Sequence, residues 1–125
     1  MDIASKKRIL VVDDSGIQLR SVRSVLVDQY EVDVATNGVK AIEKAKSRKP
    51  DLILLDYEMP VMDGRETLEV IRNDEELKDI PVIFLTSIAN QESIASVLKL
   101  KIEGYLLKPI DQKKMLETIA SILGS

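Results

Sequence analysis

The stretch Leu52–Pro60, LILLDYEMP, constrains the fold more than any other part of the chain. Four consecutive aliphatic residues, Leu52 to Leu55, are too few for an isolated helix, and prolines lie on both sides of them. Such a run predicts a strand that is buried on both faces, as in parallel sheets. Asp56 follows directly, so an acid lies at the carboxyl end of a core strand, where ligands bind in open α/β sheets. Taken alone, this acid is better explained as the start of a turn.

Strand-like and helix-like segments alternate along the whole chain. Apolar runs at 8–12, 52–55, 81–85 and 104–107 predict buried strands, and the polar–apolar alternation at 31–35 predicts a strand nearer a sheet edge. Apolar residues at helical spacing follow each strand; those expected to face inward are Ile17, Leu19, Val22, Val25 and Leu26 (a helix reaching to Tyr30), Val39, Ala41, Ile42 and Ala45, Leu68 and Ile71, Ile94, Ala95, Leu98 and Ile102, and Leu116, Ile119, Ala120 and Leu123. Five such units predict an α/β fold, a single doubly wound (βα)5 domain with a five-stranded parallel sheet of order 2-1-3-4-5.

Local signals agree with these boundaries. Ser15 and Asp63 have the residue type and position of helix N-caps, and Asp111 precedes the last helix. Asn37-Gly38 predicts a turn before the second helix.

Composition excludes several classes of function. The chain has 125 residues, enough for one domain, and its net charge of -3 is spread over interspersed acids and bases, so we expect no nucleic-acid or membrane partner. No apolar run is long enough to span a bilayer, and no signal-peptide pattern is present. There is no cysteine and no histidine, which rules out thiol chemistry, histidine ligands and histidine acid–base catalysis. The absence of cysteine fits a reducing compartment, and we expect a cytoplasmic protein.

Charged and polar residues collect at the predicted carboxyl ends of the strands. Asp13 and Asp14 follow the first strand, Asp56 the third, Thr86 the fourth and Lys108 the fifth. In the order 2-1-3-4-5 the first and third strands are neighbours, so three carboxylates are expected to converge. Such a cluster requires either a raised pKa or a cation. A hard divalent ion such as Mg²⁺, with oxygen ligands, meets this requirement.

This set of side chains suits phosphoryl chemistry. A carboxylate is able to attack phosphorus and form an aspartyl-phosphate. Asp56 is the best candidate nucleophile because it lies between the acidic pair and Lys108 with Thr86, which would stabilise charge on the equatorial oxygens. Each residue alone has a simpler explanation: an acidic pair caps helices, and Lys-Pro is common in solvated loops. Their joint occurrence at one edge makes coincidence the weaker explanation.

With these residues the chain closely resembles the receiver domain of two-component response regulators, the CheY-like family with the flavodoxin-like strand order. The likeness extends over 8–123 and is carried by ILVVDDS at 9–15, the Asn37-Gly38 turn, DLILLDYEMPVMDG at 51–64, PVIFLTS at 81–87 and GYLLKPI at 104–110.

The resemblance implies a role for each residue of the site. Asp56 would be the phosphoacceptor; Asp14 and Asp56 would bind Mg²⁺ (or Mn²⁺) directly, Asp13 largely through water, and the Glu58 backbone carbonyl would be a further ligand. Lys108 and Thr86 would hold the phosphoryl oxygens, and in this family the Lys-Pro bond is usually cis.

The resemblance also implies a switch. Thr86 would move toward the phosphoryl group and the aromatic ring of Tyr105 would turn inward. This remodels the surface formed by the fourth helix, the fifth strand and the fifth helix, through a local gain of about 1.5 to 2 negative charges. Core filling is the alternative role for Tyr105.

Some positions depart from the common family pattern. Lys101-Ile102 replaces a frequent Gly-Ala, so the fourth helix is expected to end differently. Ser87 replaces a small alanine and brings a hydroxyl near the phosphate position. Glu58 and Ile88 occupy variable positions that tune phosphate lifetime, and the apolar Ile88 predicts a longer-lived phosphoryl state.

On the last helix, Met115 and Ile122 lie off the predicted inward stripe at spacing i, i+7. Two interpretations stay open: an exposed apolar patch for dimerisation or docking, or packing against the fourth helix. A homodimer through the surface of the fourth helix, fifth strand and fifth helix is a related expectation.

Three other functions compete with the switch. A haloacid-dehalogenase-like phosphohydrolase carries a second acid two residues after its nucleophile, where this chain has Glu58, but the flanking motif differs and no cap domain fits. A flavin-binding module would need a hydroxyl- and glycine-rich phosphate loop in place of Asp13-Asp14. A phosphate-independent docking domain would lack an acid or the lysine, and none is missing.

We therefore expect a phosphoacceptor switch and not an enzyme with an independent substrate. It would take its phosphoryl group from a histidine kinase or phosphotransfer protein, catalyse its own phosphorylation and slow dephosphorylation, and act on a downstream protein. One receiver domain is expected over residues 1–125, with no output domain. A stand-alone regulator and a domain of a longer regulator are both compatible with it.

Overall fold

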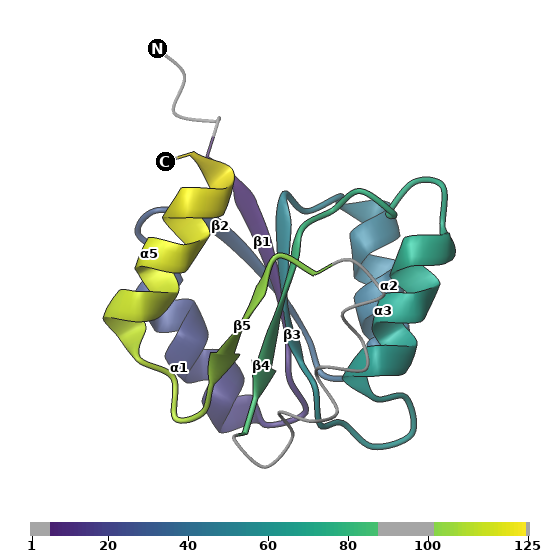
Figure 1. Cartoon of the computed structure of the whole chain (residues 1–125), viewed down its shortest axis with the longest axis horizontal. Helices are drawn as coiled ribbons and strands as arrows, with labels where there is room; N and C mark the ends of the chain where they lie inside the picture. The colour runs from purple at the N-terminus through teal and green to yellow at the C-terminus, as the bar shows by residue number, and fades with distance from the viewer. Residues whose placement is uncertain (1–5, 88–101, 125) are drawn as a thin grey trace.

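The computed structural model describes residues 6–87 and 102–124, which form a parallel sheet covered by helices on both faces (Figure 1). The strands are β1 (Arg8–Val12), β2 (Glu31–Ala35), β3 (Leu52–Asp56), β4 (Val82–Thr86) and β5 (Gly104–Leu107). Their order is β2-β1-β3-β4-β5, and every neighbouring pair is parallel. The predicted strand order is confirmed. β4 runs one residue further than the sequence predicts and includes Thr86.

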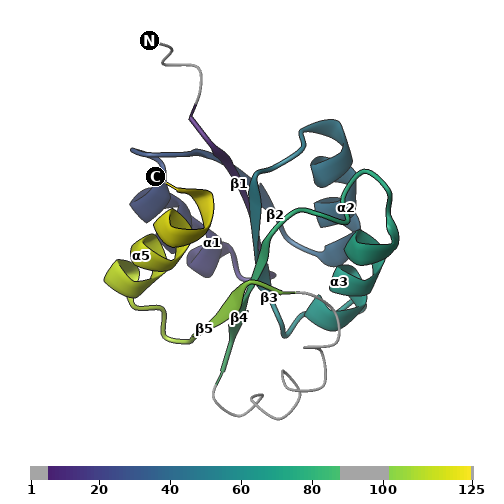
Figure 2. The same ribbon diagram turned by 45° about the horizontal axis from the view of Figure 1, so that its top comes forward.

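The described helices lie on the two faces in pairs. They are α1 (Gly16–Leu26), α2 (Gly38–Ser47), α3 (Gly64–Asn73) and α5 (Gln112–Leu123). Two views show α1 and α5 on one face of the sheet and α2 and α3 on the other (Figure 1, Figure 2). The predicted fourth helix, with Ile94, Ala95 and Leu98, and the variable position Ile88 lie outside the described residues. Among the described segments no helix is long and apolar enough to cross a bilayer.

The sheet separates the core into two clusters because alternate residues of each strand point to opposite faces. Leu10, Ile53 and Phe84 pack with α2 and α3, whereas Val11 and Leu54 pack with α1 and α5. All residues of β3 and β4 are buried, which confirms the strand predicted from LILLD. A fully buried central strand leaves its last residue, Asp56, held by the core.

Side-chain caps fix where the helices start. Ser15, Asn37 and Asp111 each accept a hydrogen bond from the backbone amide three residues later. Asp63 accepts a hydrogen bond from the Glu66 amide in the same way, and its own amide donates to the Glu66 side chain, which completes a capping box. The predicted Asn37-Gly38 turn is therefore a cap followed by the first residue of α2. Each cap satisfies an otherwise free amide next to the carboxyl edge of the sheet.

Two residues predicted to face inward are exposed. Ile17 and Val39 are 81% and 54% exposed. Both are second residues of their helices, α1 and α2. This first turn adjoins the carboxyl edge, where the strands have already ended and no sheet lies beneath it. The helix predicted to reach Tyr30 ends at Leu26, and Tyr30 is buried beyond its end.

The interpretation of Met115 as part of an exposed patch is wrong. Met115 is 1% exposed and, with Ile119, forms the buried face of α5 against Leu19, Val22 and other members of the α1-side cluster. Ile122 is partly buried against the same cluster. The inward face of α5 is thus centred on Met115 and the predicted Ile119, while the predicted Leu116 and Leu123 are only partly buried against the same cluster.

Candidate functional site

The predicted site residues meet at the carboxyl edge of the sheet. Asp13 follows β1 and donates its amide to the Ala35 carbonyl oxygen at 3.1 Å, and Asp56 ends the neighbouring strand β3. One carboxylate oxygen from each of Asp13, Asp14 and Asp56 lies within 4.8 Å of the others. Asp13 and Asp56 are buried, while Asp14 is exposed. Strand pairing therefore brings together acids that are 43 residues apart in the chain.

Lys108 supplies the positive charge of the cluster. Its Nζ lies 2.9 Å from Asp56 Oδ1 and 3.6 Å from Asp13 Oδ2. The Lys108 amide donates to the Thr86 carbonyl oxygen at 2.8 Å, and the Lys108-Pro109 peptide bond is cis, as the resemblance implies. The lysine therefore enters the site from the end of β5 and contacts both buried acids.

The protonation of Asp56 reflects its burial. The pKa of Asp56 is raised to about 6: removal from water is the largest cause and the charge of Asp13 adds to it, while Lys108 and the Glu58 amide partly offset both. For Lys108, burial alone would lower the pKa, but the hydrogen bond and charge of Asp56, together with Asp13, raise it. The lysine is a permanent cation, whereas the Asp56 carboxylate is held at an energetic cost.

The donor set fits a hard divalent cation. Asp13 Oδ1 accepts a hydrogen bond from the Ser15 amide at 2.9 Å, but Asp13 Oδ2 is buried without a hydrogen-bond partner. The amide of Glu58 and Lys108 Nζ both donate to Asp56 Oδ1, and among the described residues Oδ2 accepts no hydrogen bond. Two carboxylate oxygens therefore retain free lone pairs in one all-oxygen cluster, which is the donor chemistry of Mg²⁺.

Thr86 and Tyr105 lie on the same face of the sheet. Phe84 pairs with Tyr105 and Thr86 with Leu107, so residues 84, 86 and 105 all point to the α2–α3 side. Thr86 is completely buried, and its Oγ1 donates to the Ser87 carbonyl oxygen at 3.3 Å. Tyr105 is 43% exposed, so its ring is directed away from the core.

One residue that shapes the site carries no side chain and was not singled out from the sequence. Gly64, the first residue of α3, donates to the Tyr57 carbonyl oxygen at 3.0 Å. A Cβ at Gly64 would lie 2.7 Å from both the Asp56 carbonyl oxygen and Tyr57 Cα. Glycine is therefore needed for the start of α3 to approach the end of β3. The signal in the sequence is a glycine directly after a capping aspartate.

Comparison with known proteins agrees with the geometry. The family model for the response regulator receiver domain matches residues 9–120. A chemotaxis protein CheY from Treponema pallidum is 39% identical over 120 residues, covering 93% of this chain and 82% of that protein. The polar-differentiation response regulator DivK of Brucella anthropi is 33% identical over 119 residues, covering 94% of this chain and 97% of that protein.

Solved structures lead to the same family. The crystal structure of Vibrio cholerae chemotaxis protein CheY4 superposes with a TM-score of 0.88 at 31% identity, covering 94% of this chain and 99% of that chain. The described strand order is that of the predicted flavodoxin-like fold. The chain belongs to the response regulator receiver domain family of two-component signalling, whose members are phosphorylation-activated switches.

Proposed function

We propose that this domain accepts a phosphoryl group on Asp56 from the phosphohistidine of a histidine kinase or phosphotransfer protein. The observation that carries the proposal is the contact of Lys108 Nζ with Asp56 Oδ1 at 2.9 Å, beside two further aspartates at the same edge. Such a pair adds little to stability, because the desolvation of a buried charge offsets the attraction between the partners, so a functional role explains it better than a structural one. Asp56 would be the nucleophile, and Lys108 the cation that receives the transferred group.

The transfer balances with the residues present. The free Oδ2 lone pair of Asp56 attacks phosphorus in line with the leaving nitrogen, an O–P bond forms and the N–P bond breaks. The leaving imidazole keeps the electron pair of the broken bond. Lys108 stabilises the negative charge on the equatorial phosphoryl oxygens, and Thr86 contributes a hydroxyl after rotating away from the Ser87 carbonyl oxygen. Hydrolysis of the same O–P bond by water would return the domain to its resting state.

Asp13, Asp14 and Asp56 would hold a divalent cation, with the Glu58 backbone carbonyl as a further ligand; bound there, Mg²⁺ would neutralise charge on the entering phosphoryl oxygens. Asp13 is also positioned to keep Lys108 in place, since its Oδ2 lies 3.6 Å from Nζ. Asp13 and Asp56 would therefore order both the cation and the lysine.

The signal would be read at the surface of α5, β5 and the predicted fourth helix by a downstream protein. Thr86 and Tyr105 support this proposal because they share one sheet face on adjacent strands, and the Tyr105 ring is exposed. Movement of Thr86 toward a phosphoryl group would leave room for the ring to turn inward. Two discrete ring positions would make the surface bistable.

The proposal is tested by intact mass after incubation with acetyl phosphate, in Mg²⁺ or in EDTA. We expect one phosphoryl addition to the wild type that requires Mg²⁺ and is absent in Asp56→Asn. Asp51→Asn is the matched control because Asp51 is exposed at the opposite end of β3, and it should be phosphorylated normally. No addition to the wild type would favour a phosphate-independent docking domain, and addition to Asp56→Asn would mean that another residue is the nucleophile.

A further inference from the structure

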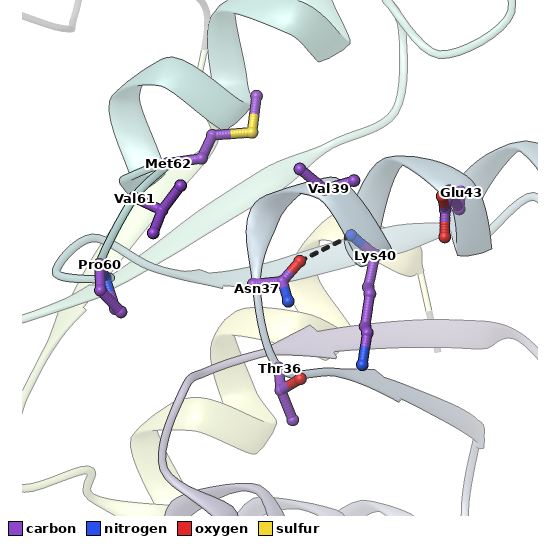
Figure 3. Close-up of a pocket in the computed structure, with 8 residues that line it drawn as sticks. All are labelled: Thr36, Asn37, Val39, Lys40, Glu43, Pro60, Val61 and Met62. Atoms are coloured by element: carbon purple, nitrogen blue, oxygen red, sulfur yellow. Dashed lines mark hydrogen bonds between the residues drawn. The ribbon is translucent and has the colours of Figure 1, made fainter.

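A groove between α2 and the loop from β3 to α3 takes no part in the proposed phosphoryl chemistry. It has a volume of about 430 Å³ and is lined by Thr36, Asn37, Val39, Lys40, Glu43, Pro60, Val61 and Met62. Figure 3 shows Val39 on one wall and Val61 with Met62 on the other. Val39 is 54% exposed and Val61 is 99% exposed. Two aliphatic side chains are thus presented to solvent across a hollow.

The exposure of Val61 is imposed by its backbone. Its φ is 69°, the only positive value at a non-glycine residue in the described chain. The Met62 amide donates to the Pro60 carbonyl oxygen at 2.7 Å, which closes a three-residue turn around Val61. For a β-branched residue this left-handed conformation is strained, and no burial of the side chain offsets the strain. Strain of this kind persists only where the surrounding structure imposes it, and it is concentrated at functional sites.

The two walls of the groove, α2 and the loop from β3 to α3, are in close contact. Gly38, at the start of α2, is buried, and a Cβ there would collide with Thr67 Oγ1 and lie 2.8 Å from Met62 Sδ. Thr67 Oγ1 in turn donates to the Asp63 carbonyl oxygen at 2.8 Å. The groove is therefore preformed, and an occupant would not have to open it.

The surface beside the groove carries acidic residues on the α3 side. Met62 also lines a second hollow along α3, with Glu66, Glu69, Val70, Asn73 and Asp74. Two of these acids are already paired: Lys46 Nζ lies 2.9 Å from Asp74 Oδ2, and Arg65 Nε lies 3.8 Å from Glu69 Oε2. Glu43 has no ion-pair partner among the described residues. Lys40 is the one basic residue among those that line the two hollows, and Figure 3 shows its side chain pointing away from Val61 and Met62. The complement of this surface is an apolar stripe with basic residues beside it.

We propose that the α2–α3 groove, defined as the two hollows that share Met62, docks an amphipathic helix of a protein partner with an aliphatic stripe flanked by Lys or Arg. A helix fits better than an added strand because the walls are helices and a loop, with no free sheet edge among the lining residues. Its aliphatic side chains contact Val39 and Val61, and its basic residues lie over Glu43 and Glu66, neither of which forms an ion pair among the described residues.

The test is a titration of ¹⁵N-labelled protein, saturated with Mg²⁺, with two synthetic peptides of about 18 residues, long enough for about 27 Å of helix. One has a leucine stripe with lysines, and the other has the same stripe with glutamates. We expect the lysine peptide to shift amide resonances of α2, α3 and residues 60–62. The double variant Val39→Ser, Val61→Ser should weaken binding about tenfold or more, equivalent to at least about 1.4 kcal/mol. Glu43→Lys should shift the preference toward the glutamate peptide.

Ile17→Ser is the matched control, since Ile17 is also an exposed aliphatic residue in the first turn of a helix. It should leave binding of the lysine peptide unchanged. All substituted side chains are exposed, so the variants retain the fold, which their spectra verify. Absence of binding, equal binding of both peptides, shifts centred on residues 13–15, or an equal loss in Ile17→Ser would each overturn the proposal.

Discussion

The substitution Asp56→Asn should make the metal-free protein more stable at neutral pH, although it removes a buried ion pair with Lys108. The reason is the raised pKa of Asp56, about 6 against its usual 3.8. Since the folded state binds the Asp56 proton more tightly than the unfolded state, the contribution of this residue to stability falls as the pH rises from about 4 to above 6. Asparagine resembles the protonated acid and does not titrate.

The magnitude follows from the same two pKa values. Their difference corresponds to about 3 kcal/mol at about 1.36 kcal/mol per pKa unit, an upper bound for the gain above pH 7. This figure already contains the favourable contribution of Lys108, because the pKa is the net of burial, Asp13 and the lysine. Below about pH 3 the acid is protonated in both states, so the difference in stability should vanish there.

Urea unfolding in EDTA, followed by far-ultraviolet circular dichroism at several pH values between 4 and 7.5, measures the difference; the chain has no tryptophan for fluorescence. Glu117→Gln is the control, since this exposed residue of α5 should change the free energy of unfolding by less than about 0.5 kcal/mol. Saturating Mg²⁺ should stabilise the wild type more than Asp56→Asn and narrow the gap. A variant that is less stable than the wild type at pH 7.5, or a gain in stability independent of pH, would show that the folded state does not raise the pKa of Asp56.

Three further predictions concern single side chains. Lys108→Ala should slow phosphorylation by acetyl phosphate by about 10²–10³, as measured by intact mass against time, because its Nζ is the cation nearest to Asp56; an unchanged rate would remove its proposed role. Met115→Ala should lower the free energy of unfolding by about 2–5 kcal/mol in urea titrations, and a loss below about 0.5 kcal/mol would contradict its burial. Val61→Gly should raise the free energy of unfolding by about 1 kcal/mol, because glycine adopts the positive φ without strain and this gain exceeds the cost of its greater chain entropy. A lower free energy of unfolding would show that the turn is unstrained.

The strand order and part of the site could be predicted from the sequence, because the burial of the strands and their parallel order together determine both. A short aliphatic run bounded by prolines favours a central strand, and the acid after such a strand then lies at the carboxyl edge of the sheet. Parallel order then brought Asp13, Asp56 and Lys108 together, as the sequence predicts. Residue type and strand order sufficed for this part of the site because the carboxyl ends of parallel strands share one edge.

The orientation of residues within helices was less predictable. α5 is apolar over a wide arc, so periodicity identified the helix but not that Met115 is innermost; contact with α1 decides that. Ile17 and Val39 fit the helical period but lie in first turns beyond the ends of the strands. Periodicity carries no information about where the sheet beneath a helix ends.

Backbone features escaped prediction for a different reason. The left-handed Val61 contradicts its own residue preference, so only the surrounding structure can impose it. Gly64 is required by the distance to the Asp56 carbonyl oxygen, a contact across the loop that spacing along the chain does not express.

The proposed switch depends on Asp56 as the residue that carries the phosphoryl group. The most direct measurement is reduction of the acetyl phosphate-treated protein with borohydride, which converts an aspartyl-phosphate to homoserine, followed by peptide sequencing by mass spectrometry. We expect homoserine at position 56, only when Mg²⁺ was present during phosphorylation and not in Lys108→Ala treated for the same short time. Homoserine at Asp13, Asp14 or another carboxylate, with Asp56 unmodified, would contradict the account.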